Sequence, residues 1–219
     1  MLKAVIFDLD GVITDSAAYH YAAWKVLADR MNIPFDKSYN EKLKGVSRME
    51  SLNLILDNAL GRDAYPESVK EELATEKNDI YKEMIKNITK KDLLPGIEAL
   101  LKDCKARGIK IALASASKNA PEIVKRLEIE DYFDYMADAG AVKRSKPYPD
   151  IFAVCAENLN IDPSECCGIE DSEAGIDAIN SAGMFSVGVG SKDKMQKADL
   201  ILSGTGELSL DLIIKKLIA

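Results

Sequence analysis

The sequence lacks the features that would mark a membrane-bound, secreted or zinc-containing protein. Its first residues, MLKAVIFDLDG, have no basic leader, and acidic residues interrupt their apolar stretch, so neither a secretory signal nor a membrane span is expected. The four cysteines show no C-x-x-C spacing, and the single histidine, His20, lies far from them along the chain, which argues against a zinc site. We therefore expect a cytoplasmic protein with reduced, mostly buried thiols.

Positive charge is also in short supply. The chain has 29 Lys and Arg against 36 Asp and Glu, which gives a formal net charge of −7. A basic footprint supplies most of the affinity of proteins for nucleic acids and anionic membranes, so neither is expected as a partner. An anionic small molecule would have to be bound locally, by lysines, arginines or a metal ion. We expect the chain to act on such a molecule as a monomer.

What the sequence does contain is an alternation of short apolar runs and helical patterns. With 219 residues, 47% of them hydrophobic, the chain can bury a substantial core. Runs rich in β-branched residues recur as KAVIFDL, KIALAS, CCGIED, FSVGVG and DLILS, with helical patterns such as GIEALLKDCKARG and NAPEIVKRLEI between them. Strands that alternate with helices predict an α/β fold with a doubly wound parallel sheet.

One long interval breaks this alternation. From Asp15 to about Lys91 the chain shows helical patterns only, in SAAYHYAAWKVLADRM, NEKLKGVSRMESLNLILDNAL and PESVKEELATEKNDIYKEMIKN. We predict an all-helical cap domain at 15–91, inserted after the first strand of a Rossmann-like core formed by 1–14 and 92–219. The two crossings, near 14–16 and near 89–95, are expected to act as hinges.

Polar side chains follow several of the predicted strands. Ligands of open parallel sheets bind at the carboxyl ends of the strands, so these side chains are expected to converge. Gly11 would let the chain turn sharply after the first of them. The set comprises Asp8 and Asp10 after KAVIF, Ser115, Ser117, Lys118 and Asn119 after KIALA, Lys146 in a loop before a helix, and Glu170, Asp171 and Ser172 after CCGI.

These residue types suit phosphoryl transfer. Two aspartates together with Asp171 favour a hard dication, and we expect magnesium. Asp8 can then attack phosphorus as a nucleophile, and Asp10, two residues later, is placed to protonate the leaving oxygen and later deprotonate the incoming hydroxyl. Lys146 is the candidate counter-charge. Ser115 and the amides that open the following helix would hold the phosphoryl oxygens.

The order of the motifs resembles a known superfamily. VIFDLDG, IALAS, Lys146 in SKPYPD and GIEDSEAG resemble, in this order, the four motifs of the haloacid dehalogenase superfamily, and the resemblance spans essentially the whole chain. An acid two residues after the nucleophile is typical of its phosphotransferases rather than its dehalogenases. The segments YHYAAW, LKGVSRMESL, EKND and LASASKN resemble its sugar phosphomutases, which move a phosphoryl group between two hydroxyls of a hexose through a bisphosphate.

The resemblance implies a role for each matching residue. Asp8 would be the phosphorylated nucleophile and Asp10 the general acid and base, with magnesium held by Asp8, the Asp10 carbonyl and Asp171, and with Glu170 beside them. His20 and Lys77 would couple cap closure to the positioning of Asp10. Binding of a sugar phosphate is implied for Ser115, Ala116, Ser117, Lys118, Asn119 and Lys146 in the core, and for His20, Trp24, Gly45, Val46, Ser47, Arg48 and Lys77 in the cap.

Simpler explanations exist for each feature taken alone. A D-x-D pair at a strand end is more often a turn, Arg48 suits a solvated surface, and His20 and Trp24 suit ordinary helix packing. Two other functions also stay open. A sugar-phosphate phosphatase would use the same nucleophile with water as the acceptor, and a non-catalytic sugar-phosphate-binding module would keep the fold but has no use for a nucleophile paired with its acid.

Overall fold

The computed structural model describes residues 1–217, which form two compact units. The core consists of Met1–Asp15 together with the chain from Ile88 onward, and the cap consists of Ser16–Asn87. The bounds expected from the sequence, 15–91 for the cap, differ from these by one residue at the first crossing and four at the second. Each unit contains a hydrophobic cluster of its own.

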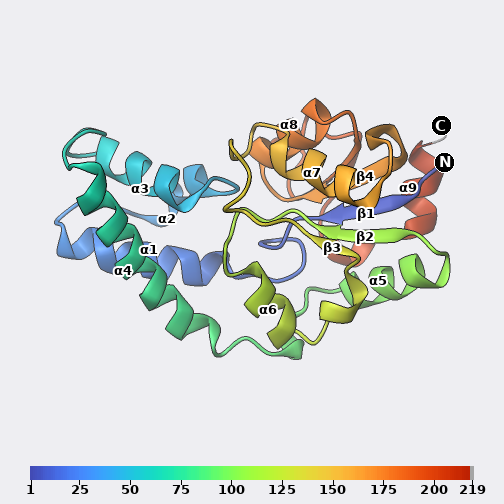
Figure 1. The fold of residues 1–219 in the computed structure, drawn as a ribbon, viewed down its shortest axis with the longest axis horizontal. Helices are drawn as coiled ribbons and strands as arrows, with labels where there is room; N and C mark the ends of the chain where they lie inside the picture. The colour runs from blue at the N-terminus through green and yellow to red at the C-terminus, as the bar shows by residue number, and fades with distance from the viewer. Residues whose placement is uncertain (218–219) are drawn as a thin grey trace. The chain divides into compact units, whose positions relative to one another are not determined.

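The core is built on a six-stranded sheet in the order β3-β2-β1-β4-β5-β6 (Figure 1). Every neighbouring pair is parallel, and the order runs outward from β1 in both directions, so the predicted doubly wound parallel sheet is confirmed. The register places Phe7 of β1 beside Leu113 of β2 and Ile169 of β4. The strands are β1 (Ala4–Phe7), β2 (Lys110–Leu113), β3 (Tyr135–Met136), β4 (Cys166–Glu170), β5 (Phe185–Val189) and β6 (Leu200–Leu202).

Helices cover both faces of this sheet. The helices of the core are α5 (Ile97–Ala106), α6 (Ala120–Arg126), α7 (Asp150–Leu159), α8 (Glu173–Ser181) and α9 (Leu210–Leu217), with 3-10 turns at η2 (Lys90–Asp92), η3 (Glu130–Tyr132), η4 (Pro163–Glu165) and η5 (Thr205–Glu207). Helices α7 and α8 lie on one face, and α5, α6 and α9 lie on the other (Figure 1). Coverage on both sides explains why the strands read as continuous apolar runs.

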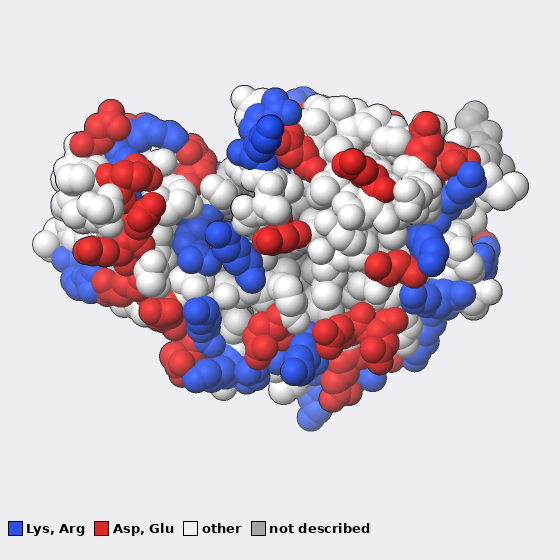
Figure 2. All heavy atoms as spheres, viewed as in Figure 1, with Lys and Arg blue, Asp and Glu red and all other residues white. Residues whose placement is uncertain are grey.

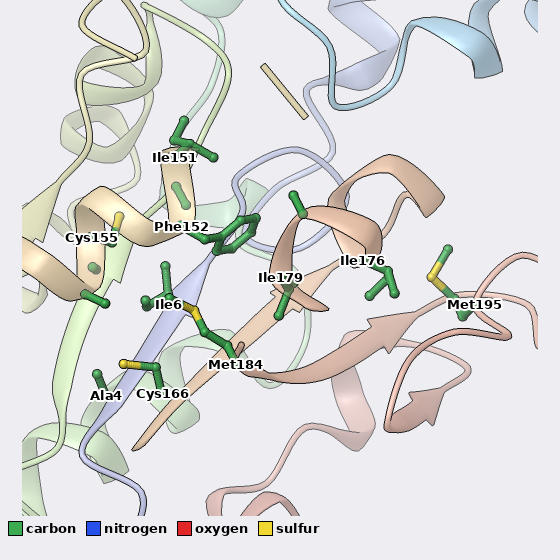
Figure 3. Close-up of a cluster of buried hydrophobic side chains, with 14 residues drawn as sticks. Ala4, Ile6, Ile151, Phe152, Cys155, Cys166, Ile176, Ile179, Met184 and Met195 are labelled. Atoms are coloured by element: carbon green, nitrogen blue, oxygen red, sulfur yellow. The ribbon is translucent and has the colours of Figure 1, made fainter. Parts of the chain in front are cut away.

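The α7 and α8 side of the sheet is filled by alternate strand residues. Ala4 and Ile6 point to this face because successive side chains alternate along a strand, and they pack with Phe152 of α7 and Ile179 of α8 (Figure 3). Gly168 of β4 lies under Ile179, and a Cβ at Gly168 would come within 2.6 Å of that side chain. The glycine therefore lets α8 pack closely on β4, just after the strand ends.

Two differences from the predicted strands have simple reasons. Strand β3 is absent from the sequence prediction because it has only two residues, both half-buried at the edge of the sheet, and so gives no apolar run. Strand β1 ends at Phe7, one residue before Asp8. The apolar run KAVIFDL therefore extends beyond the strand, and Asp8 and Asp10 both lie in the turn that follows.

The cap is helical throughout, as predicted. Its elements are α1 (Ala17–Arg30), α2 (Lys37–Asn40), η1 (Glu41–Leu43), α3 (Arg48–Asp57) and α4 (Glu67–Ile85). Trp24 and Leu27 of α1 pack with Leu52 and Leu56 of α3 and Ala74 of α4. The helical pattern expected over residues 40–60 is interrupted, because the segment 44–47 separates η1 from α3.

The surface and the cysteines fit the charge and composition of the chain. Lys and Arg side chains are interspersed with Asp and Glu on the face shown in Figure 2. Within residues 1–217, no helix is long and apolar enough to cross a membrane. All four cysteines are free and buried, as the sequence predicts.

Candidate active site

The carboxyl ends of β1 and β4 bring three acidic residues together. The backbone N–H of Asp8 donates to the carbonyl of Ile169 at 3.0 Å, which sets Asp8 beside Glu170 at the end of β4. Ligand oxygens of Asp8, Glu170 and Asp171 all lie within 4.8 Å of one another. Neighbouring parallel strands thus create the cluster from segments that are far apart in sequence.

Lys146 joins two of these carboxylates. Its Nζ lies 2.6 Å from Asp8 Oδ1 and 2.7 Å from Glu170 Oε1, and the whole residue is only 1% exposed. The ammonium also lies 5.1 Å from the centre of the Phe152 ring, at the start of α7. A buried cation in contact with two buried anions satisfies the requirement that charge removed from water must be paired.

Burial and charge act in opposite directions on this cluster. Burial raises the pKa of the Asp8 carboxyl well above its ordinary range, and the charges of Glu170 and Asp10 add to the rise, while Lys146 opposes it. For Lys146, burial lowers the pKa, but Asp8 and Glu170 outweigh burial and the net shift is upward. The lysine is therefore held as a cation, and a nearby dication would favour the ionised, nucleophilic form of Asp8.

The turn after Asp8 depends on Gly11. This residue has a φ of +78°, in the left-handed region that favours glycine, and its N–H donates to the carbonyl of Thr14 at 2.8 Å. A Cβ at this position would lie 2.2 Å from Asp171 Oδ2. Gly11 thus both turns the chain and leaves room for an acidic side chain of the cluster, which adds a steric reason to the one predicted.

The segment after β2 folds back on its own hydroxyls. The N–H of Ser117 donates to Ser115 Oγ at 3.1 Å, and the N–H of Asn119 donates to Ser117 Oγ at 3.3 Å. Ser115 is buried, Ala116, Ser117 and Asn119 are half-buried, and Lys118 is exposed. Two of the amides predicted to hold phosphoryl oxygens therefore donate to serines here, just ahead of α6.

In the cap, residues 45–48 form the turn that opens α3. Gly45 has a φ of +73°, and the Ser47 hydroxyl caps the helix by accepting from the N–H of Glu50 at 3.3 Å. Val46 and Arg48, the latter being the first residue of α3, are half-buried beside them. A glycine turn followed by a serine N-cap explains why the helical pattern breaks at this point.

The other predicted cap residues meet between α1 and α4. His20 Nδ1 lies 2.7 Å from Lys77 Nζ, and the ammonium lies 4.8 Å from the ring centres of both Trp24 and Tyr81. The His20 ring stacks on Tyr81 with 4.0 Å between ring centres. Burial lowers the pKa of His20 well below its ordinary value, and the positive charges of Lys77 and Arg48 lower it further. His20 is therefore neutral and can accept a hydrogen bond from Lys77.

The acidic cluster fits a divalent metal. Carboxylate oxygens are the ligands that hard dications prefer, and Asp8 and Glu170 are buried with Asp171 half-buried at their edge. The space that Gly11 leaves beside Asp171 lies next to a carboxylate of this cluster. The cluster therefore agrees with the metal requirement implied by the resemblance.

A family model for haloacid dehalogenase-like hydrolases matches residues 2–183, a range that includes Asp8, Ser115, Lys146 and Asp171. The chain belongs to this family. The resemblance inferred from the order of the motifs is thereby confirmed. The cap, Ser16–Asn87, lies along the chain between β1 and β2 of the core.

Individual proteins similar to this chain include sugar phosphomutases and a carbohydrate phosphatase. The chain is 50% identical over 212 residues to the β-phosphoglucomutase of Bacillus subtilis. The alignment covers 97% of this chain and 94% of that protein. The crystal structure of β-phosphoglucomutase from Clostridium difficile superposes with a TM-score of 0.98 at 51% identity, covering 100% of this chain and 98% of that chain. A phosphorylated carbohydrates phosphatase of Thermotoga maritima is 32% identical, covering 84% of this chain and 82% of that protein.

The predicted residues thus fall into two groups, one in each unit. Asp8, Lys146, Glu170 and Asp171 are in mutual contact or within a few ångströms in the core, while His20, Trp24 and Lys77 meet in the cap. Three residues that contact these groups have no predicted role. They are Tyr81, which stacks on His20, Ser172, which the sequence placed at the strand end without a function, and Gly175.

Proposed function

We propose that the chain is a β-phosphoglucomutase that interconverts β-D-glucose 1-phosphate and D-glucose 6-phosphate through a phosphorylated aspartate and a β-glucose 1,6-bisphosphate. The observation that carries this proposal is the buried contact between Asp8 and Lys146 beside Asp171, in a chain 50% identical over nearly its whole length to a β-phosphoglucomutase. The geometry supports the chemistry, and the similarity supports the choice of sugar.

In the proposed reaction Asp8 is the nucleophile. In the first transfer a carboxylate oxygen of Asp8 forms a bond to the phosphorus at C1 of β-glucose 1,6-bisphosphate as the bond from that phosphorus to the sugar oxygen breaks, and Asp10 donates a proton to that oxygen, which leaves glucose 6-phosphate. In the second transfer Asp10 removes a proton from the 6-hydroxyl of β-glucose 1-phosphate, whose oxygen takes the phosphoryl group from Asp8 and forms the bisphosphate again. Asp8 is then free again, so the two transfers balance.

Lys146 and a magnesium ion would offset the repulsion between Asp8 and the phosphate. We propose that magnesium is held by Asp8, the Asp10 carbonyl and Asp171, with Glu170 beside them; when bound, it neutralises negative charge on the phosphoryl oxygens. Lys146 is already in contact with the nucleophile at 2.6 Å, so it can also contact a phosphoryl oxygen placed for attack. Ser115 and the Ala116 amide would bind the remaining oxygens of this group.

Recognition of the sugar and of the second phosphate is proposed for the other predicted residues. Arg48 with Ser117, Lys118 and Asn119 would bind the phosphate that is not being transferred, and Gly45, Val46 and Ser47 would line the sugar. His20, Trp24 and Lys77 would couple cap closure to the placement of Asp10. Binding energy from the distant phosphate could thereby be used to complete the catalytic arrangement only when a sugar phosphate is present.

A monomer in the cytoplasm is the setting we propose. Buried free thiols fit a reducing compartment. Among the described residues, the exposed large hydrophobic side chains are Met1, Val26, Leu60 and Tyr148, which are widely spaced along the chain. The net charge of −7 supports a small-molecule substrate rather than nucleic acid.

A sugar-phosphate phosphatase of the same family is the second candidate. It is favoured by the 32% identity to the Thermotoga phosphorylated carbohydrates phosphatase, and it would use the same phosphorylated aspartate with water as the acceptor. The two functions therefore differ in the acceptor and not in the first step. A non-catalytic binding module is disfavoured by the Asp8, Lys146 and Asp171 set.

A coupled assay separates these functions. Glucose 6-phosphate formed from β-glucose 1-phosphate is measured with a dehydrogenase, with magnesium and a trace of β-glucose 1,6-bisphosphate as primer, and the α anomer serves as the matched control substrate. We expect turnover of the β anomer with little release of inorganic phosphate. Phosphate release from many phosphomonoesters without glucose 6-phosphate formation would replace the mutase by the phosphatase.

A further inference from the structure

Glu170 is bound through both of its carboxylate oxygens. Oε1 accepts from Lys146 Nζ at 2.7 Å, on the side of the nucleophile. Oε2 accepts from the backbone N–H groups of Asp171 and Ser172, at 2.6 and 2.8 Å, and from the Ser172 hydroxyl at 3.0 Å. The residue is fully buried, so these donors replace the water that the carboxylate gives up.

The Ser172 hydroxyl links this carboxylate to a helix. Ser172 is the N-cap of α8, and its Oγ accepts from the N–H of Gly175 at 3.1 Å. A hydroxyl has one proton to donate. Here the Ser172 hydroxyl donates that proton to Glu170, and a lone pair of its oxygen accepts the hydrogen bond from the N–H of Gly175. The orientation of Glu170 is therefore tied to the first turn of α8, which is itself packed closely on β4 over Gly168.

Gly175 supplies the space that this arrangement needs. A Cβ on Gly175 would lie 2.0 Å from both Cδ and Oε1 of Glu170. Gly175 lies within α8, a regular helix, where its backbone needs no positive φ. The requirement for glycine at this position is thus one of space, and any side chain there would push Glu170 away from its present place.

We propose that Ser172 and Gly175 are positioning residues that orient Glu170 toward Lys146 and thereby hold the lysine against Asp8. Ser172 acts through a hydrogen bond and Gly175 through the absence of a side chain. This orientation of Glu170 and Lys146 is a property of the protein without substrate or metal. Its effect on turnover rests on the proposed phosphoryl transfer, in which Lys146 contacts the transferring group.

The alternative is that Ser172 only stabilises the start of α8, and the chain offers a matched control for this. The Ser186 hydroxyl of β5 donates to Asp199 Oδ2 at 3.0 Å and accepts from the N–H of Asp199 at 3.0 Å. Ser186→Ala therefore removes the same two kinds of hydrogen bond from a serine in the same core. Asp199 has no part in the proposed reaction.

The test compares Ser172→Ala, Ser172→Thr and Ser186→Ala. Proton–carbon correlation spectra of lysine side chains are recorded on the metal-free proteins, with the Lys146 signals assigned by their loss in Lys146→Arg. We expect Ser172→Ala to shift the Lys146 signals, Ser172→Thr to restore them, and Ser186→Ala to leave them in place. With metal and substrate, Ser172→Ala should lower kcat about tenfold to a hundredfold with little change in KM, because a hydrogen bond to a charged group is lost.

Gly175→Ala gives a second measurement that uses steric exclusion instead of hydrogen bonding. It should shift the Lys146 signals more than Ser172→Ala does. If Lys146 signals stay unchanged in Ser172→Ala, while thermal stability falls as it does in Ser186→Ala, Ser172 is only a helix cap and the proposal is overturned. If the signals move as expected but the wild-type protein shows no mutase activity, the positioning role stands and the proposed function fails.

Discussion

The core and the cap each bury a lysine, and they do so in different ways. Lys146 in the core lies between two carboxylates, at 2.6 and 2.7 Å. Within the cap, Lys77 lies 2.7 Å from the neutral ring of His20 and 4.8 Å from the centres of two aromatic rings. Lys146 is paired with full negative charges, and the cap neighbours of Lys77 include a ring-nitrogen lone pair and two aromatic ring faces.

The difference indicates what each lysine can do. Removing one member of a buried ion pair leaves an uncompensated charge, so Lys146 is strongly fixed in its place. Cation–π contacts are worth about 0.5–2 kcal/mol and tolerate changes of direction, so the Lys77 ammonium is held more weakly by its cap neighbours. The double ion pair of Lys146 suits the reacting centre, and the contact of Lys77 with His20 suits the proposed coupling between cap closure and catalysis.

The largest expected effect comes from removing the nucleophile of the core. Asp8→Asn keeps the shape of the side chain but replaces a carboxylate by an amide, which does not attack phosphorus. We expect turnover of β-glucose 1-phosphate to fall below detection while the circular dichroism spectrum stays unchanged. Near-normal turnover in this variant would refute the role assigned to Asp8. Asp134→Asn, which removes a core carboxylate that accepts from the Ile111 N–H, is the matched control and should keep its activity.

Replacing the two lysines tests the comparison itself. Lys146→Met leaves Asp8 and Glu170 without their cation, and breaking a buried pair in this way costs about 3–5 kcal/mol. Lys77→Met keeps the length of the side chain and loses the contacts with His20 and the rings, at a cost of about 2 kcal/mol. The free energy of unfolding in urea is measured by circular dichroism for both. Equal losses would show that the two burial modes are energetically alike.

Much of the fold could be predicted from the sequence because its signals are local. Apolar runs marked five strands, and the helical period marked the cap, since both patterns depend only on which residues face a core. Strand β3 was not predicted, because two half-buried residues at the sheet edge form no apolar run. The break at 44–47 was not predicted, because the helical period continues on both sides of it. Gly45 and Ser47 are nevertheless residue types that favour a turn and a helix N-cap.

The candidate site could be predicted only in part. Residue type and motif order identify Asp8, Lys146 and Asp171, but the contact of Lys146 with Glu170 depends on strand order, which no local pattern contains. The sequence placed Ser172 at the strand end without revealing that its hydroxyl binds both a carboxylate and a helix N–H. Spatial needs such as that of Gly175 appear only when the neighbouring side chain is in place.

A smaller effect is expected from the titration of His20 in the cap. Because the pKa of His20 is lowered in the folded protein, the unfolded chain binds a proton below about pH 6.5 that the folded protein does not. Stability therefore rises with pH between the folded pKa and about 6.5, by up to about 1.4 kcal/mol per unit, and makes no further gain above that range. His20→Gln should lose this part of the slope. The cap can be monitored separately because the only tryptophan, Trp24, lies in α1.

The groups that contact or face His20 determine the pH range in which its titration affects stability. Lys77 and Arg48 are the positive charges that lower its pKa, and Tyr81 stacks against its ring. Unfolding followed by Trp24 fluorescence at several pH values gives the slope for wild type and His20→Gln. An identical slope in the two proteins would show that another group titrates in this range and that His20 is not protected from protonation by the cap.

The smallest expected effect is in the thiols, which report on the core alone because all four cysteines lie outside the cap. Burial raises the pKa of Cys104 and of Cys155 to about 12 and that of Cys166 to about 11, so almost no thiolate is present near neutral pH. We expect Ellman's reagent to label the native protein only slowly and to label four thiols in urea. Lys77→Met should leave this slow labelling unchanged, whereas Lys146→Met should accelerate it, because only the second variant destabilises the unit that contains the thiols. Equal acceleration in both variants would mean that the two units open together. The claim that Lys77 stabilises the cap alone and Lys146 the core alone would then be wrong.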